Sequence, residues 1–401
     1  MHEREWREAI DLRSSLLSIG LVVMSAALLR YWNLRHGVVS PAETRIVGPV
    51  VQLLQTGSYH PDALVQPTLP VYLHAGVAIV HFLWGAIGGA WQSTSAFGAA
   101  QLVAWGRASS ALLGTASVFV VYHIGMRWGA RHALLGAGLM AVTPMHVAAS
   151  REIGSGAPLT FCTALALYFS LTATERATRR PLLAAGAASG FAAACHYAGA
   201  IAIVMPLVAV WMTRRDESSR LSRAAVALLS ALAAFVIATP LSVRALPAFL
   251  NGFAAAAAPP GQAADVNLLD QLLWALQWPG VILAFAGLSL ALVRAITGPG
   301  HTRWTLLAIF PLVYFALVAW HGALSDAIVL PMLPACTVLA AIAVVSGVSQ
   351  LRRFEIPRAV RTALIAALTV AVLLPPAVFS IELVRQAGKN RGVSVPAGTD
   401  R

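Results

Sequence analysis

The apolar residues of this chain fall into blocks of similar length, separated by short polar clusters that are rich in arginine. A helix of about 20 apolar residues spans the hydrocarbon of a bilayer and satisfies its own backbone hydrogen bonds. The pattern therefore predicts an all-α, multi-pass integral membrane protein with about 11 transmembrane helices. The predicted spans cover residues 15–32, 104–124, 133–150, 158–174, 182–196, 198–213, 224–243, 273–293, 304–320, 328–348 and 362–384.

One apolar block, Leu69–Ile87, does not fit a simple alternation of spans. If it crossed the membrane, the cluster Arg127–Arg131 would lie outside, against the tendency of arginine to stay in the cytoplasm. If it instead lies along the outer interface or re-enters, every later basic cluster faces the cytoplasm. We therefore expect a long first outer loop over 33–102 that contains juxtamembrane helices.

This topology defines the expected domains and location. The membrane domain covers 1–384, its N-terminus is cytoplasmic, and a polar non-cytoplasmic tail follows over 385–401, where the chain is interpreted as truncated. The expected compartment is the plasma (inner) membrane, with the active-site side periplasmic or extracellular.

The composition agrees with this class and excludes another. Of the 401 residues, 58% are hydrophobic and 11% are charged, whereas a soluble domain has about 25% charged residues. The net charge of +12 does not indicate a nucleic-acid partner, because the arginines form brief clusters between apolar blocks. The three cysteines all lie inside apolar blocks, so they predict no disulfide and no metal site.

The outer segments resemble those of a known family. Residues 40–79 begin SPAETRIVGPVVQLLQTG, and Glu43, Gly57 and Pro67 keep the spacing of an acidic pair, a glycine and a proline-rich helix entry. This order is similar to the first outer loop of GT-C membrane glycosyltransferases, near the protein O-mannosyltransferase family 39 and the ArnT-like superfamily. Later segments of this family have counterparts in this chain, in the same order, at residues 106–151, 157–169, 183–207, 239–250 and 329–341.

The resemblance implies a GT-C-like helical bundle that moves a sugar, with inversion, from a polyprenyl-phosphate carrier to an acceptor outside the cytoplasm. The acceptor class, whether lipid, glycan or protein, is left open. Glu43 is expected to act as the catalytic acid on the acceptor hydroxyl. Carrier phosphate is expected at His196, Tyr197 and Arg151, and further substrate contacts at His60, Asp62, Gln66 and Glu152. Arg107 is a weaker candidate for phosphate, because an arginine near the end of a span is commonly an interfacial anchor.

Several positions depart from the family pattern. Ala42 replaces the Asp before Glu43, Gly156 replaces an Asp of the second outer loop, and His196 replaces a Lys. Ala327 stands where the family often has an Arg-Tyr pair. Many members use a divalent cation held by carboxylates and phosphate, but the usual acidic ligands are missing here, so no metal site is predicted and the cofactor is left open. His74 and His81 share a helical face, yet two histidines without a nearby third ligand do not predict a metal site.

Three functional hypotheses follow. The first is a polyprenyl-phosphate-sugar-dependent glycosyltransferase. The second is a catalytically inactive relative that binds the lipid carrier or serves as a scaffold. The third is a transporter of lipid-linked sugars, which the scarcity of charged residues in the predicted spans disfavours.

Overall fold

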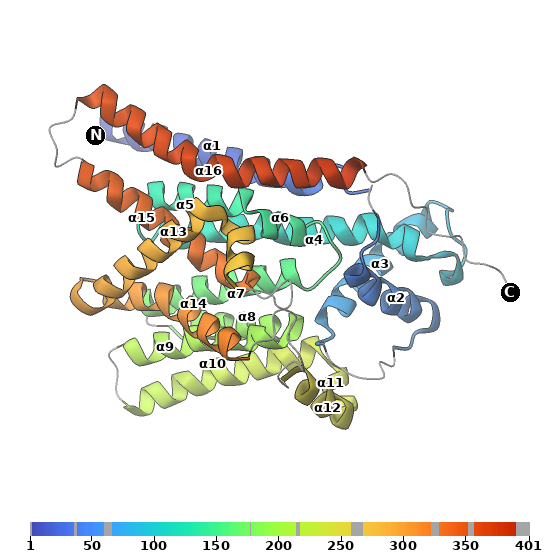
Figure 1. Ribbon diagram of the computed structural model, residues 1–401. Coiled ribbons are helices and arrows are strands. Elements are labelled where there is room, and N and C mark those ends of the chain that lie inside the picture. The colour runs from blue at the N-terminus through green and yellow to red at the C-terminus, as the bar shows by residue number, and fades with distance from the viewer. Residues whose placement is uncertain are drawn as a thin grey trace.

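The computed structural model describes residues 2–35, 38–59, 66–176, 178–213, 217–257, 268–321, 329–351 and 357–389, and its regular elements there are all helices (Figure 1). The α-helices are α1 His2–Tyr31, α2 Pro41–Thr56, α3 Leu69–Ile87, α4 Ala99–Gly125, α5 Ala130–Val142, α6 Pro144–Ala149, α7 Gly156–Glu175, α8 Arg180–Cys195, α9 Val204–Met212, α10 Glu217–Ala238, α11 Leu241–Arg244, α12 Leu246–Ala257, α13 Leu268–Thr297, α14 His301–His321, α15 Leu333–Leu351 and α16 Arg358–Lys389. Three short 3₁₀ segments are η1 Thr94–Ala96, η2 Tyr197–Ile203 and η3 Leu330–Met332.

The predicted all-α membrane bundle is confirmed. Eight of the described helices are long and apolar enough to cross a membrane, and four shorter apolar helices accompany them. The count of 11 spans stays a prediction. The helix α16 continues to Lys389, beyond the expected domain boundary at 384, and Gln386 donates a hydrogen bond to Glu382 one turn earlier.

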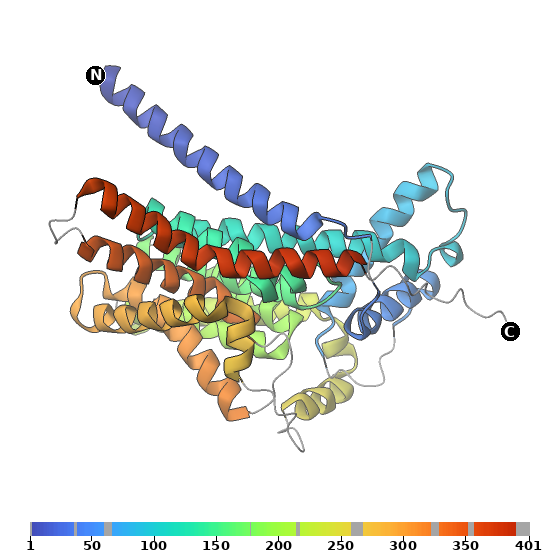
Figure 2. The ribbon, with the colours of Figure 1, turned by 45° about the horizontal axis from the view of Figure 1, so that its top comes forward.

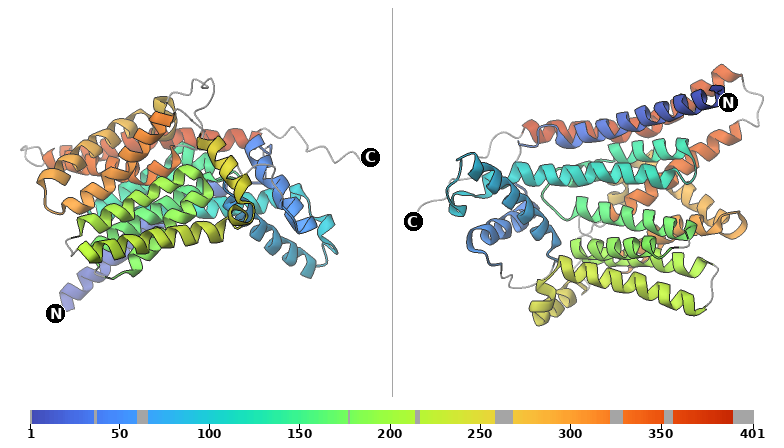
Figure 3. Two further views of the ribbon diagram at one scale, coloured as in Figure 1. Left: turned by 90° about the horizontal axis from the view of Figure 1, so that it is seen from below. Right: turned by 180° about the vertical axis from the view of Figure 1, so that it is seen from behind.

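The bundle has two chemically different ends. One end of the bundle, here called the basic end, holds the start of α1, the ends of α9 and α15, and the α4–α5 and α13–α14 connections (Figure 1). There Arg303 donates to the carbonyl of Arg127, and Arg127 pairs with Glu175 at 2.9 Å. The helices α2, α3, α11 and α12 lie at the opposite end, here called the site end, as views from below and behind also show (Figure 3).

The helix α3 stays at the site end although its length and composition would allow it to span a membrane. The end of α1 lies beside the start of α4, because the Tyr31 hydroxyl donates to the carbonyl of Ala108 at 3.1 Å. Between these two points α2 and α3 pack against each other beyond the long helices (Figure 2). This arrangement agrees with the expected outer loop, while the depth of α3 in a bilayer stays a prediction.

The break between α5 and α6 at Pro144 leaves four carbonyl groups without helical partners. Side chains satisfy all four. The guanidinium of Arg30, which is fully buried, donates to the carbonyls of Met140 and Ala141 at 3.2 and 3.0 Å. Thr143 donates to the carbonyl of Leu139. Ser380 of α16 donates to the carbonyl of Val142. The same Arg30 guanidinium contacts the Nδ1 atom of His146 at 2.8 Å, so α1, α5, α6 and α16 are joined at this break.

Candidate functional site

Glu43 is positioned first by its own helix. Ser40 and Glu43 form a capping box, in which the Ser40 hydroxyl accepts from the Glu43 N–H at 3.1 Å. The Glu43 carboxylate in turn accepts from the Ser40 N–H at 3.0 Å. The Ser-x-x-Glu pattern with proline after the serine was visible in the sequence, and it fixes Glu43 in the first turn of α2.

Glu43 is also paired with Arg107 of α4 in a buried, two-pronged contact. Arg107 Nε lies 2.8 Å from Oε1, and a terminal nitrogen of Arg107 lies 2.7 Å from Oε2. The backbone N–H of Ile153 donates to Oε1 at 3.1 Å. Together with the bond from Ser40, each carboxylate oxygen accepts two hydrogen bonds, and Glu43 has no exposed surface. The described geometry therefore makes Glu43 a tie between α2, α4 and the 151–156 loop, and its catalytic role stays a prediction.

Arg107 extends this tie to the segment after α1. Its terminal nitrogens donate to the carbonyls of Leu34 and Val38 at 3.2 and 3.1 Å. The guanidinium of Arg107 therefore donates hydrogen bonds to Glu43, Leu34 and Val38, so it positions α2 and the segment after α1 relative to α4.

The 151–156 loop contributes one buried cation and one exposed carboxylate. Arg151 is 7% exposed and donates to the carbonyls of Leu29 and Arg30 in the last turn of α1 and to that of Trp32 just after it. Burial, and then the nearby Arg107, lower the pKa of Arg151 to about 10, so the guanidinium stays protonated at neutral pH. Glu152 is exposed, and its charge acts on Arg107.

Gly156, where the family resemblance led us to expect an Asp, lies close to neighbouring side chains. A Cβ atom there would lie 2.7 Å from Leu330 and 3.0 Å from Ala149. A side chain at residue 156 would therefore disturb the packing of α7 against η3.

His196 and Tyr197 occupy the turn between α8 and η2. His196 ends α8, and its Nδ1 atom accepts from the N–H of Ala198 at 3.2 Å. Burial lowers the pKa of His196 below its ordinary value of 6.5, so the ring is neutral at pH 7 and does not supply a permanent cation. The ring of Tyr197 packs edge-on against Phe253, with centroids 5.3 Å apart.

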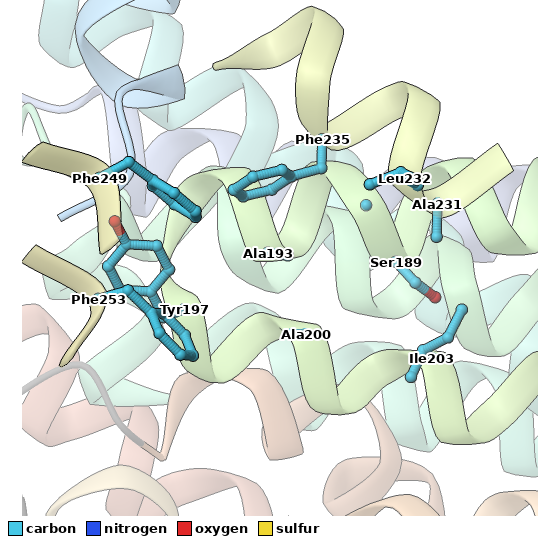
Figure 4. A pocket seen from close by; sticks show the side chains of 11 residues that line it. Ser189, Ala193, Tyr197, Ala200, Ile203, Ala231, Leu232, Phe235, Phe249 and Phe253 are labelled. Atoms are coloured by element: carbon cyan, nitrogen blue, oxygen red, sulfur yellow. The ribbon is translucent and has the colours of Figure 1, made fainter. Parts of the chain in front are cut away.

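An apolar groove begins at Tyr197. It has a volume of about 290 Å³ and runs between α8, η2, α10 and α12. Figure 4 shows Tyr197, Phe249 and Phe253 gathered at one end of it, and Ser189 and Ile203 at the other. A smaller hollow adjoins the aromatic end, and its polar lining residues are Gln66, Thr68, Tyr197, Thr239 and Ser242.

The helix α3 connects the two groups of residues. Its N-cap Thr68 lines the hollow beside Tyr197, and its buried His74 lies in the electrostatic field of Glu43. Thr68 and His74 are six residues apart, which corresponds to about 9 Å along α3. His74 also contacts the Ser109 hydroxyl at 3.3 Å. From the sequence, His74 was considered only as a metal ligand. No sequence pattern indicated that it would lie between the Glu43 region and the Tyr197 region.

The structure thus brings Glu43 and the 151–152 pair together, and it brings Gln66 together with Tyr197. His60, Asp62 and Ala327 lie outside the described residues. Within the described ranges, no group of three or more His, Cys, Asp or Glu side chains could hold a metal ion. The saturated oxygens of Glu43 and the side-chain-free Gly156 do not fit a cation site, and we derive no step through a metal.

Comparisons with known proteins establish the fold. The family model of dolichyl-phosphate-mannose-protein mannosyltransferases matches residues 89–243. The oligosaccharyltransferase of Archaeoglobus fulgidus in the apo form superposes with a TM-score of 0.66 at 14% identity, over 93% of this chain and 56% of that one. ArnT from Cupriavidus metallidurans, bound to undecaprenyl phosphate, gives a TM-score of 0.61 at 19% identity, over 92% of this chain and 72% of that one.

No curated protein sequence matches the chain. The chain spans just over half the length of the archaeal oligosaccharyltransferase. These likenesses confirm the predicted resemblance, and the chain is a multi-pass membrane protein with the GT-C fold.

Proposed function

We propose that this chain transfers a sugar from a polyprenyl-phosphate carrier to an acceptor at the site end of the bundle. Two proteins of the same fold support a lipid carrier: the archaeal oligosaccharyltransferase was solved with a dolichol-phosphate, and ArnT with undecaprenyl phosphate. We further propose that the site end faces away from the cytoplasm, because Arg127 and Arg303, in the α4–α5 and α13–α14 regions, lie at the opposite end.

The groove beside Tyr197 is the observation that supports this proposal most. Its lining is aromatic and aliphatic, as an isoprenoid chain requires, and its aromatic end adjoins the hollow lined by Gln66 and Ser242. The carrier tail would lie in the groove, and its phosphate would accept hydrogen bonds at the polar end, near the His196–Tyr197 turn. The sugar would then extend along α3 toward His74 and Glu43.

We assign the carboxylates different roles. Glu152 is exposed beside this region and would orient or deprotonate the acceptor hydroxyl, which attacks the anomeric carbon as the carrier phosphate leaves. Glu43 and Arg107 would hold the loop that presents Glu152. Arg151 would anchor the same loop to α1 and add positive charge for the phosphate.

A transfer assay tests this assignment. The purified chain in lipid nanodiscs would receive labelled polyprenyl-phosphate hexoses and pentoses together with membrane-derived acceptors. Glu152→Gln should lower the transfer rate by at least about 100-fold, the usual contribution of a general base. Glu217→Gln is the matched control, because Glu217 is an exposed acid at the start of α10, at the basic end. Equal rates for wild type and Glu152→Gln would contradict the role of Glu152.

The carrier site needs its own test. Ala200→Phe places a ring in the groove, whereas Ala363→Phe places one on an exposed face of α16. We expect only Ala200→Phe to weaken binding of polyprenyl phosphate, measured with purified chain by native mass spectrometry. Equal affinities would remove the carrier from this groove.

The buried state of Glu43 and the lack of space at Gly156 favour a second candidate, an inactive carrier-binding protein. It predicts carrier binding that Ala200→Phe weakens, without any sugar transfer by the wild-type chain. The two assays together therefore separate the two functions.

A further inference from the structure

A second cavity lies at the site end, away from the groove beside Tyr197. Its volume is about 520 Å³, and it lies between the end of α1 and the first half of α4. The lining residues are Tyr31, Asn33, Leu34, Arg35, Ala104, Trp105 and Ala108, none of which lines the groove.

The cavity combines one cation with aromatic rings. Arg35 is exposed, and within the described ranges it has no ion-pair partner. Tyr31 and Trp105 are each 41% exposed, and the neighbouring Trp32 is 64% exposed. Tryptophan, tyrosine and arginine gather at the level of lipid headgroups, where each has an apolar part and a polar end.

Apolar surface continues from the cavity along both helices. Leu28 lies three residues before Tyr31 on α1 and is 55% exposed, and Leu112 lies four residues after Ala108 on α4 and is 60% exposed. Residues at these spacings share a helical face. The cavity is therefore polar and cationic at the end of α1 and apolar toward the middle of the bundle.

We propose that this cavity binds one anionic phospholipid from the surrounding leaflet. Its phosphate would lie at Arg35 and Asn33, its glycerol region between Tyr31 and Trp105, and its acyl chains on Leu28 and Leu112. The single cation at the polar end selects a headgroup with net negative charge. This inference does not depend on sugar transfer.

Bound lipid would also order the neighbouring site. The carbonyl of Leu34, which lines the cavity, accepts a hydrogen bond from Arg107. Arg107 holds Glu43, and Glu43 holds the 153 position of the loop. A lipid at Arg35 thus rests on the segment that anchors the buried pair.

Native mass spectrometry of the purified full chain, titrated with phosphatidylglycerol or phosphatidylcholine, tests the proposal. We expect one phosphatidylglycerol to bind more tightly than phosphatidylcholine. Arg35→Gln should weaken that binding by about fivefold, the effect of one basic residue near a lipid surface. Arg45→Gln is the matched control, because Arg45 is an exposed arginine on α2 outside the cavity, and its affinity should stay at the wild-type value.

Three results would overturn the proposal. The first is binding that does not depend on charge, seen either as equal affinity of the wild-type chain for the two phospholipids or as an unchanged affinity for phosphatidylglycerol in Arg35→Gln. The second is displacement of phosphatidylglycerol by inorganic phosphate alone, which would make the cavity a phosphate site. The third is displacement by polyprenyl phosphate at lower concentration than phosphatidylglycerol itself, which would make it a carrier site. Ala104→Trp, which fills the cavity from α4, should block binding without moving the charge at Arg35.

Discussion

The substitution Glu43→Gln separates a positioning role from a catalytic one. In the wild-type chain the carboxylate accepts four hydrogen bonds, two from Arg107 and one each from the N–H groups of Ser40 and Ile153. A glutamine of the same shape keeps one acceptor oxygen and turns its amide nitrogen toward two donors. It also removes the negative charge that pairs with Arg107.

The expected cost is large because both partners are buried, with side-chain exposures of 6% and 1%. Removing one partner of a buried ion pair costs about 3–5 kcal/mol, since the remaining charge is left without compensation. In the double variant Glu43→Gln/Arg107→Met neither charge of this pair remains. We therefore expect it to recover about 2 kcal/mol relative to the sum of the single variants, a coupling within the range for residues in contact.

Equilibrium unfolding in mixed micelles would measure the free energies of wild type, both single variants and the double variant. The transfer rate of each folded variant would be measured in parallel. Positioning by Glu43 predicts a loss of stability in Glu43→Gln that the second substitution partly restores. If Glu43→Gln unfolds with the wild-type free energy and yet loses transfer, Glu43 is a catalytic residue that acts on the acceptor, and the positioning argument is refuted.

Three further predictions concern packing, capping and pH. A Cβ on Gly190 of α8 would meet the carbonyl of Ala231, so Gly190→Ala should lower the thermal unfolding temperature and reduce the free energy of unfolding by about 1–3 kcal/mol. Gly48 has open space around it, so Gly48→Ala should raise the free energy of unfolding by up to about 1 kcal/mol. The substitution Arg151→Met leaves carbonyls at the end of α1 without their donor, so the free energy of unfolding should fall by about 1–3 kcal/mol. Amide hydrogen exchange in the last turn of α1 should become faster, and exchange at the wild-type rate would contradict this prediction. Burial lowers the pKa of His196 below 6.5, so the unfolded chain binds a proton at this residue more readily than the folded chain does. The contribution of His196 to the free energy of unfolding should therefore be complete above pH 6.5 and decrease as the pH falls below it. The substitution His196→Asn should remove this pH dependence of the free energy of unfolding.

The apolar blocks predicted the bundle because a bilayer leaves few alternatives to helices. The positions of α4 and α7 follow directly from their block boundaries. The backbone of α13 is non-helical at Gln277, inside the span expected over 273–293, and this kink was not predicted. The expectation that α3 lies outside the set of spans required a second argument, the distribution of arginine, since its composition alone resembles that of a span, and this expectation stays a prediction. The break at Pro144 was not predicted: a single span was expected over 133–150, because the side chains that satisfy its carbonyls come from distant helices.

The candidate site was predictable as a region but not as a set of contacts. Glu43 and Arg107 are 64 positions apart, and Glu43 and Ile153 are 110 apart, so no spacing rule joins them. The sequence also did not show that Glu43 is buried. The Ser40–Glu43 capping box was the one local signal that this acid has a structural task.

The contacts of Arg30 have a consequence for biosynthesis. Arg30 leaves the ribosome within the first apolar helix, while its acceptors at Met140 and Ala141 and its neighbour His146 are more than a hundred residues away. A guanidinium within a span is costly until such partners arrive. The helix α1 therefore cannot make these contacts until the chain has been synthesised past His146, so its final placement is coupled to that of α5 and α6.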